Sequence, residues 1–445
     1  MTTPRRCANL RWMRHLTLEN LDIHTKEEYV RRGYPWEEWD LLRKTAPVFW
    51  YEREGLKPFW AITRHADILT VSKHDKVFVN SQRLRLQMQV EDDLQFGWSR
   101  ARAEARGWDP DEVLDFIFMD DPRHRAFRLV TAREFTPARL RTLADGFSDL
   151  SQQFAEELSA DLEQASAQDE TINFVRSFAQ KLPIAAIGRM MGLPETDWLR
   201  LKQLTNVIIG APEEDYYLPE ENRDQATLRA VDEMSDYMIG VIEDRKRRGP
   251  GGHDLSSIIV HARIDGQELT EQQLQGYLFV ILTAGNETTQ NAISGGVGAL
   301  LAHPEQSAML AADPDLADSA AEEILRWTSP VVQFARTAVQ DFELAGTTIK
   351  AGDDVGLWYP SANRDESVFQ DPYVFDITRT PNHHLAFGGF GAHFCLGANL
   401  ARWELRAALR ALAPILHTFE STGPLERVAN LHVSAIHRLP VQARA

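Results

Sequence analysis

Apolar residues recur at helical spacing through most of the chain. A period near 3.6 residues places apolar side chains on one face of a helix. The pattern predicts helices over residues 148–162, 182–191, 269–301 and 396–416. Neither an internal repeat nor a long Gly/Ser-rich linker divides the chain. We therefore expect one compact domain that is mainly helical.

Shorter segments are rich in aromatic and β-branched residues, which is typical of strands. Residues 47–54 and 57–64 flank Gly55 and predict a hairpin. Residues 342–349 and 353–360 flank residues 350–352 and predict a second hairpin. Charged or Pro/Gly-rich segments predict loops at residues 81–115 (with one or two short helices), 211–224 and 245–254. The expected fold class is mainly α with small β-sheets (α+β).

Acidic residues outnumber basic ones. The chain of 445 residues contains 48 Lys and Arg and 65 Asp and Glu, a formal net charge of −17. This balance argues against a general nucleic-acid binder, because phosphate binding needs a basic surface. No stretch approaches the ~18 apolar residues of a membrane span. Residues 1–19 carry arginines without an apolar run, which predicts an N-terminal arm, or a transit peptide, before a domain of residues 20–445.

The two cysteines of the chain are Cys7 and Cys395. Two distant thiols exclude a disulfide framework and suit a reducing cytoplasm, where we expect the protein. Cys395 lies among four glycines, at 388, 389, 391 and 397, just before a predicted helix. The positive end of a helix favours a thiolate, which suits a nucleophile or an axial ligand of an iron macrocycle. A buried structural cysteine is the alternative.

The predicted helix over residues 269–301 carries polar residues in an apolar setting. It opens with Thr270 and Gln273, the pattern of a capping box. Its interior contains residues 284–289, Ala-Gly-Asn-Glu-Thr-Thr. A helical glycine costs ~1 kcal/mol relative to alanine, and an unpaired acid in an apolar helix costs more. These residues indicate a functional site, or else a satisfied polar patch between helices.

Two further pairs have helical spacing. Glu323 and Arg326 are three residues apart, and His124 and Arg128 are four apart and can reach two carboxylates together. Each pair alone is also typical of a solvated helix surface. The neighbouring residues His383 and His384 are interpreted as loop, because no cysteine or acid lies at ligand spacing.

Together these motifs resemble the cytochrome P450 superfamily. The segment Gly391-x-His393-x-Cys395-x-Gly397 resembles its haem-binding loop. Residues 284–288, the pair Glu323-x-x-Arg326 with residues 375–379, and residues 121–128 resemble three other motifs of the family. The resemblance extends over residues 20–445 in the family's motif order. In one departure, Phe387 lies eight residues before Cys395 instead of seven, which leaves open whether Phe387 or Phe390 shields the sulfur.

The resemblance implies a cytochrome P450 fold with haem b (iron protoporphyrin IX) between the long central helix and the cysteine loop. It implies that Cys395 is the ligand of the iron, that Thr288 hydrogen-bonds the bound dioxygen and that Glu287 relays protons. It implies a structural network of Glu323, Arg326 and Arg379. The other cofactor-binding residues that it implies are His124, Arg128, Ala284, Arg336, Phe387, His393 and Gly397.

The implied activity is monooxygenation, in which one oxygen atom of O2 enters a C–H bond of a hydrophobic small molecule. The loop form favours a sterol or steroid, a terpenoid or a branched lipid. The implied substrate contacts are Leu282, Val331, Val332, Gln333 and Phe334. The alternatives are a small aromatic or other natural product as substrate, a haem-binding sensor or electron carrier, and a hydrolase with a cysteine nucleophile.

The implied electron donors are a ferredoxin and a ferredoxin reductase that uses NAD(P)H. A local basic patch on this acidic chain would attract an acidic donor. It consists of Arg123, Arg125, Arg133, Arg139 and Arg141. We expect a monomer without a nucleic-acid partner or a membrane span.

Overall fold

Helices make up most of the structure, a computed structural model that describes residues 16–113, 115–209, 211 and 216–444. The predicted arm therefore lies mostly outside the described residues, as does Cys7. The helices are α1 Lys26–Arg32, α2 Trp36–Thr45, α3 His65–Lys73, α4 Gln89–Ala105, α5 Arg123–Thr131, α6 Pro137–Arg141, α7 Ala144–Ser166, α8 Lys181–Met191, α9 Trp198–Ile209, α10 Arg223–Arg248, α11 Leu255–Val260, α12 Glu271–Ala302, α13 Pro304–Ala312, α14 Ala317–Thr328, α15 Tyr359–Ala362 and α16 Ala398–Leu412.

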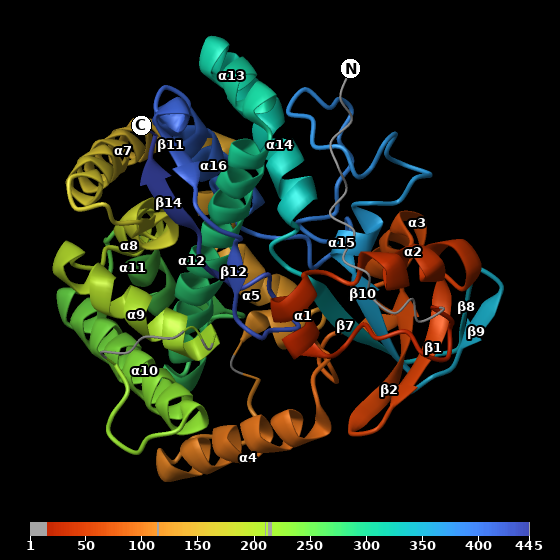
Figure 1. Ribbon diagram of the computed structural model, residues 1–445. Helices are drawn as coiled ribbons and strands as arrows, with labels where there is room; N and C mark the ends of the chain where they lie inside the picture. Colours follow the sequence, from red (N-terminus) through yellow and green to blue (C-terminus); the bar gives the residue numbers. More distant parts are fainter. Residues whose placement is uncertain (1–15, 114, 210, 212–215, 445) are drawn as a thin grey trace.

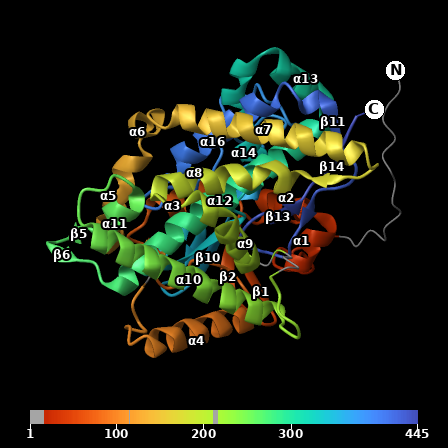
Figure 2. The same cartoon turned by 90° about the vertical axis from the view of Figure 1, so that its left-hand side faces the viewer.

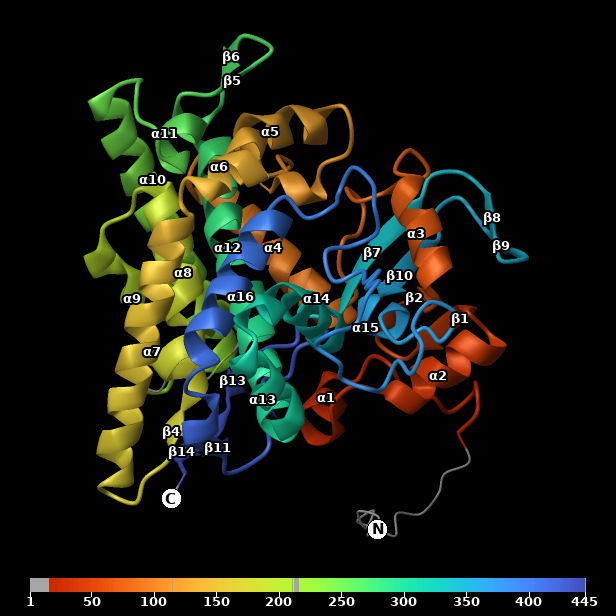
Figure 3. The same ribbon diagram turned by 90° about the horizontal axis from the view of Figure 1, so that it is seen from above.

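The strands are short. They are β1 Val48–Arg53, β2 Leu56–Ile62, β3 Phe78–Val79, β4 Ile172–Asn173, β5 Arg263–Ile264, β6 Gln267–Glu268, β7 Gln333–Ala338, β8 Phe342–Leu344, β9 Thr347–Ile349, β10 Asp354–Trp358, β11 Phe419–Ser421, β12 Glu426–Arg427, β13 Ile436–Arg438 and β14 Pro440–Ala443. The largest sheet has the order β1-β2-β10-β7-β3. It lies at one side of the molecule, and the helices α7–α11 lie at the other (Figures 1 and 3).

The first predicted hairpin is present and the second is wrong. β1 and β2 pair antiparallel around Gly55, with Trp50 opposite Trp60. The turn of the second hairpin falls inside the segment that we expected to be one strand, at Ala345 and Gly346, so that β8 pairs with β9. β10 instead joins β2 and β7 in the large sheet, where it is buried along its whole length. Tertiary burial thus decides the pairing of β10.

Residues 81–115 contain a longer helix than predicted. α4 extends over 17 residues and begins just after the N-cap residue Met88, whose N–H is accepted by the Glu91 carboxylate at 3.2 Å. Its apolar residues Leu94 and Phe96 are exposed, so no apolar stripe marks the helix in the sequence. Ion pairs from its last turns to α10 hold it against the rest of the molecule, including Arg102 to Asp232 at 2.8 Å.

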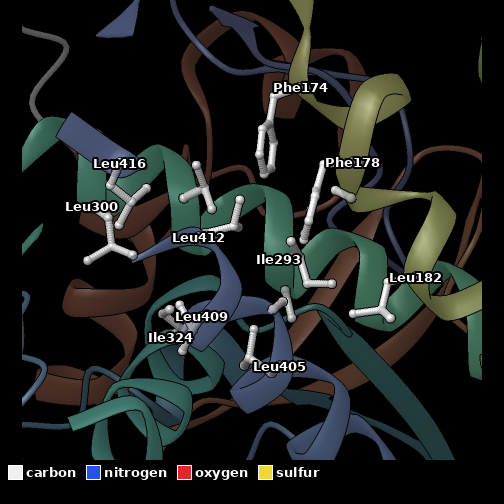
Figure 4. Packing of buried hydrophobic residues seen from close by; sticks show 14 of the residues in the cluster. Phe174, Phe178, Leu182, Ile293, Leu300, Ile324, Leu405, Leu409, Leu412 and Leu416 are labelled. Atoms are coloured by element: carbon white, nitrogen blue, oxygen red, sulfur yellow. The ribbon is translucent and has the colours of Figure 1, made fainter. Parts of the chain in front are cut away.

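The long helix α12 crosses the centre of the molecule. The predicted capping box is present, since Gln273 N donates to Thr270 Oγ1 at 3.2 Å and Thr270 N donates to the Gln273 side chain at 3.0 Å. α8 and α10 pack against α12 from different directions (Figure 2). In the main apolar cluster, Ile293 of α12 meets Leu405 and Leu409 of α16, with Phe178 nearby (Figure 4). This packing fixes α16, and with it the cysteine loop, relative to α12.

The chain forms a single compact domain, mainly helical with small sheets, as the sequence pattern predicts. In the described part of the chain, no helix is both long enough and apolar enough to cross a lipid bilayer.

Candidate active site

The cysteine loop is a tight turn packed on α3. Cys395 N donates to Phe387 O at 3.1 Å, which closes the loop. Gly388 has a φ of +85°, a backbone conformation that favours glycine. A Cβ atom on Gly391 would lie 2.0 Å from the carbonyl oxygen of Ser72 in α3. These two glycines therefore allow the loop to bring Cys395 to the start of α16, where its side chain is accessible.

The electrostatic surroundings of the sulfur are mixed. Protein atoms surround Cys395 closely even though solvent reaches its side chain, and this burial raises the pKa of the thiol. The Gly397 N–H and the guanidinium groups of Arg128 and Arg402 lower that pKa, but by less. The helix N-terminus by itself therefore does not hold Cys395 as a thiolate, contrary to our expectation. A bound metal cation would do so, because coordination deprotonates a thiol.

The centre of α12 has one open face. Ala284 is exposed and Thr288 is half-buried, whereas nearly all residues of the following two turns are buried. The two residues are four apart and share a helix face. Thr288 Oγ1 donates to Ala284 O at 2.9 Å, which fixes the hydroxyl on this face. Gly285 instead faces α8, since a Cβ there would lie 3.2 Å from Ile187, so it serves helix packing.

Glu287 points away from the open face and is paired. Its Oε1 lies 2.5 Å from Nζ of Lys202 in α9, and both side chains are buried. Its Oε2 has no hydrogen-bond partner among the described residues. Next to it, Asn286 Nδ2 donates to Thr205 Oγ1 at 2.8 Å, again in α9. No sequence motif marks Lys202, and its only signal is a lysine within the apolar pattern of residues 198–209.

Cationic groups converge between α5, β7 and the cysteine loop. The rings of His124 and His393 stack with centroids 3.9 Å apart. Arg128 and Arg336 have no carboxylate partner among the described residues, and Arg336 donates only to Ala335 O, at 2.6 Å. Burial lowers the pKa of both arginines, and burial with the nearby His124, Arg336 and Arg128 lowers the pKa of His393 to about 2. Such a group of donors suits a ligand with anionic substituents.

α5 reaches this position because it is held on α12. Tyr277 of α12 donates its hydroxyl proton to Phe127 O at 2.7 Å and also hydrogen-bonds Thr131 at 2.9 Å. Asn399, in the first turn of α16, donates to Phe135 O at 3.1 Å and so links the segment after α5 to α16. α5 and the start of α16 are therefore held in place independently of any ligand.

Residues 99–430 match the family model described as cytochrome P450. The chain belongs to the cytochrome P450 family. It is 35% identical over 433 residues to the methyl-branched lipid omega-hydroxylase of Mycobacterium tuberculosis, with 96% of this chain and 94% of the relative covered. It is 33% identical over 403 residues to the steroid C26-monooxygenase of the same organism, with 88% and 86% covered.

The fold also matches solved P450 structures. The Mycobacterium marinum cytochrome P450 CYP268A2 in complex with pseudoionone superimposes with a TM-score of 0.83 at 30% identity, covering 95% of this chain and 98% of the other. The protein is thus a cytochrome P450 monooxygenase, and the family implies haem b as its cofactor.

The residues of this P450 fit a haem. Cys395 presents an accessible sulfur, the suitable ligand for a P450 iron. The open face of α12 at Ala284 and Thr288 provides a second wall. Arg128 and Arg336 supply donors without acid partners among the described residues, the two stacked histidines lie beside them, and haem b has two propionate carboxylates to receive such donors. Each of these features stands on the geometry of the protein alone.

The structural network of the P450 is assembled as expected. Arg326 donates to both carboxylate oxygens of Glu323 at 2.7 Å, and Arg379 Nε lies 3.2 Å from Glu323 Oε2. Glu323 and Arg326 are fully buried. The remaining donors of Arg326 reach backbone carbonyls of residues 363, 372 and 374, so the pair fixes the segment before the cysteine loop.

The two rings that could shield the sulfur differ in burial. Phe387 is half-buried against the main apolar cluster, and the Arg402 guanidinium lies 4.5 Å from its centroid. Phe390 is 61% exposed and stacks on Phe394 at 5.4 Å. Which of them shields the sulfur stays open. His384, interpreted from the sequence as loop, pairs with Glu322 at 3.1 Å.

Three of the predicted substrate contacts instead pack against, or hydrogen-bond, other parts of the protein. Leu282 is fully buried in the cluster around α8–α11 because it lies on the opposite side of α12 from Ala284. Val332 packs into the cluster under the large sheet. The Gln333 amide donates to Leu86 O at 3.0 Å and accepts from Leu86 N at 3.3 Å, so it holds the backbone. Val331 and Phe334 are half-buried, and their contact with substrate stays a prediction.

Proposed function

We propose that this cytochrome P450 hydroxylates a branched lipid, a sterol or steroid, or a terpenoid. The names of the two mycobacterial relatives and the pseudoionone complex support this range of substrates. Phe279 of α12 and the expected substrate contacts Val331 and Phe334 are half-buried and apolar. Apolar walls favour a hydrophobic ligand because its binding removes apolar surface from water.

We assign four residues to the binding of haem through its periphery. His124, Arg128, Arg336 and His393 would donate to the propionates, and Cys395 would supply the sulfur ligand. When bound, the haem thiolate supplies the activation of O2 for insertion into a C–H bond. The single observation that carries the proposal is the position of the Cys395 loop beside α5, where the ring of His393 stacks on that of His124 with centroids 3.9 Å apart.

Two residues of α12 would handle protons. Thr288 offers a hydroxyl on the open face, and Glu287 lies in the same helix turn with one carboxylate oxygen free of hydrogen bonds in the described structure. In this arrangement Thr288 holds a proton at Oγ1, while Glu287 receives protons from the side of α9. Lys202 orients the Glu287 side chain, because its Nζ lies 2.5 Å from Glu287 Oε1.

We further propose a ferredoxin as electron donor. Arg125, Arg133 and Arg141 are exposed near α5 and α6, whereas Arg123 and Arg139 are partly engaged by Glu112 and Glu134. Asn399 links this region to the start of α16, two residues beyond Gly397. The basic patch would therefore lie on the same side of the haem as Cys395. An acidic donor bound there would be close to the haem, which favours electron transfer.

The test uses the purified holoprotein. A reduced, carbon-monoxide-treated sample should give the red-shifted Soret band of thiolate ligation. A screen of branched fatty acids, sterols and terpenoids should then find ligands that change the ferric spectrum, and those ligands should yield hydroxylated products with NAD(P)H, ferredoxin reductase and ferredoxin. Spectral binding without product for every ligand would favour a sensor and contradict the proposal. Activity limited to small aromatic compounds would contradict the substrate range.

A further inference from the structure

The guanidinium of Arg85 has no ion-pair partner among the described residues. No oxygen of the described residues lies within hydrogen-bond or ion-pair distance of it, and its Nε is buried with no acceptor. The centroid of the Phe118 ring lies 5.9 Å from the guanidinium carbon. The residue as a whole is only half-buried, so part of the side chain borders accessible space.

This state is unusual within the molecule. Arg83, two residues earlier, binds Asp354 at 3.0 Å. The other buried arginines outside the proposed haem site are bonded to carboxylates or carbonyl oxygens, namely Arg43, Arg245, Arg326 and Arg364. A buried guanidinium without an acceptor is costly, so proteins satisfy nearly all of them. The unsatisfied donors of Arg85 therefore need a separate explanation.

The backbone around Arg85 is firmly placed. Ala335 N donates to Leu84 O at 2.6 Å, and the Gln333 amide makes two hydrogen bonds to the backbone of Leu86. Leu84 and Leu86 are both buried. The segment is thus a continuation of the sheet edge at β7, and Arg85 is held in position instead of lying on a free loop.

Arg85 lies close to the proposed substrate region. Its neighbours Leu84 and Leu86 hydrogen-bond Ala335 and Gln333, the residues on either side of Phe334. The Phe334 ring lies 4.8 Å from that of His432, whose Nδ1 lies 2.9 Å from Gln333 O. The Arg336 guanidinium lies 5.9 Å from the Phe334 centroid, so Phe334 also borders the proposed propionate donors.

Arg85 is distinct from those donors. The charges that act on Arg336 are Tyr359 and Asp120, whereas the charge that acts on Arg85 is Asp115. Asp115 is a weak counter-ion, because burial raises its pKa to about 7 and no oxygen of it lies within 4 Å of Arg85. Burial, with Arg85 nearby, also lowers the pKa of His432, which keeps its ring neutral. The site holds a positive charge and lacks a full negative one.

We propose that Arg85 binds a carboxylate on the substrate, so that the natural substrate is an amphipathic acid, either a fatty acid or a steroid acid. This inference rests on the proposed function, since it names the polar end of the hydrophobic substrate. A guanidinium pairs with a carboxylate through two parallel hydrogen bonds, and such a pair is strong when water is excluded. The apolar remainder of the acid would extend along Phe334 and Val331 toward the open face of α12.

The experiment measures binding to the ferric holoprotein, without turnover. Hexadecanoic acid is compared with its methyl ester, and a cholanic acid with its methyl ester, by spectral titration and by calorimetry. The wild type should bind at least one acid about tenfold more tightly than its ester, the usual size of a charge-assisted hydrogen bond. Arg85→Met should remove this preference, and Arg85→Lys should keep part of it.

The matched control is Arg100→Met, since Arg100 of α4 is paired at the surface with Glu104 and Asp111. This variant should keep the preference for the acid. If only hexadecanoic acid binds more tightly than its ester, the substrate is a fatty acid. If only the cholanic acid does, the substrate is a steroid acid. Equal affinities of the wild type for acid and ester would overturn the inference. It would also be overturned if Arg85→Met lost affinity for the acid and for the ester by the same factor.

The folding of Arg85→Met is checked by its haem content and its carbon-monoxide band. Loss of haem from both Arg85 variants would assign Arg85 to the cofactor and reject a substrate role. Oxidation of neutral terpenoids or esters by an enzyme without acid preference would leave the proposed function intact while rejecting this inference. Failure of the carbon-monoxide band in the wild type would instead reject the proposed haem site.

Discussion

Lys202 Nζ and Glu287 Oε1 lie 2.5 Å apart in a buried ion pair that joins α9 to α12. The pair couples the helix with the proposed proton-handling residues to a neighbour that sequence motifs do not mark. Two buried charges are tolerated only because each compensates the other. The position of α9 and the charge of Glu287 therefore depend on each other.

Removing the lysine should destabilise the protein. We expect Lys202→Met to lower the free energy of unfolding by about 3 kcal/mol, because it leaves Glu287 as an uncompensated buried charge. The double variant Lys202→Met/Glu287→Leu should regain most of this loss, since both charges are then absent. Denaturant titration of the wild type, Lys202→Met and the double variant measures the free energy of unfolding of each. If Lys202→Met were as stable as the wild type, the result would contradict a buried ion pair.

Thr288→Ala should uncouple NAD(P)H oxidation from product formation. The hydroxyl on the open face of α12 is lost, so hydrogen peroxide release should rise while product per NAD(P)H falls. Thr288→Ser keeps a hydroxyl and should stay close to the wild type. Glu287→Gln should slow turnover by roughly 10²-fold, the usual contribution of a positioned acid or base. Unchanged coupling in Thr288→Ala would remove the role that we assign to Thr288.

The unpaired arginines predict how firmly haem is held. Arg336→Leu should release haem to an acceptor protein roughly tenfold faster or more, because one charge-assisted hydrogen bond to a propionate is lost. Arg141→Leu, at an exposed position of α6, serves as the control and should release haem at the wild-type rate. Equal release rates for the two variants would show that Arg336 does not contact a propionate.

Glu322 predicts a loss of stability in acid. Burial raises the pKa of Glu322, but hydrogen bonds from His384 and Arg402 outweigh it and lower the pKa to about 2 from its ordinary 4.5. A carboxyl with a lower pKa in the folded state stabilises it fully above pH 4.5, and this contribution is lost as the pH falls toward 2. The contribution is about 3 kcal/mol.

We expect the unfolding free energy of Glu322→Gln to depend less on pH between about 5 and 2 than that of the wild type. Denaturant titrations at a series of pH values compare the two proteins. At pH 7 the variant should be the less stable one, and the difference should shrink in acid. Parallel pH profiles would exclude Glu322 as the group responsible.

Much of the fold follows from local signals. The period of apolar residues predicts α7, α8, α12 and α16, and the capping box at Thr270 fixes the start of α12. Gly55 predicts the first hairpin. These features depend on neighbours in the sequence, and the physical rules for them are local. α4 has no such signal because its apolar side chains are exposed.

The chemistry of the site was also readable, since motif spacing marks Cys395, Thr288 and Glu323 independently of three-dimensional context. The side on which each residue lies was not. Leu282 and Ala284 are two residues apart in one helix, yet the first is in the core and the second is exposed. Helix periodicity separates them, but only packing decides which face borders the site.

The sequence by itself determined the mainly helical architecture, the cysteine loop and the types of residue available for haem, because these depend on short-range patterns. Only the tertiary structure decided that Lys202 pairs with Glu287, that β10 leaves its neighbour β9 for the large sheet, and that the buried Nε of Arg85 has no hydrogen-bond acceptor among the described residues. Each of these depends on contacts between segments tens or hundreds of residues apart, and burial sets their energies.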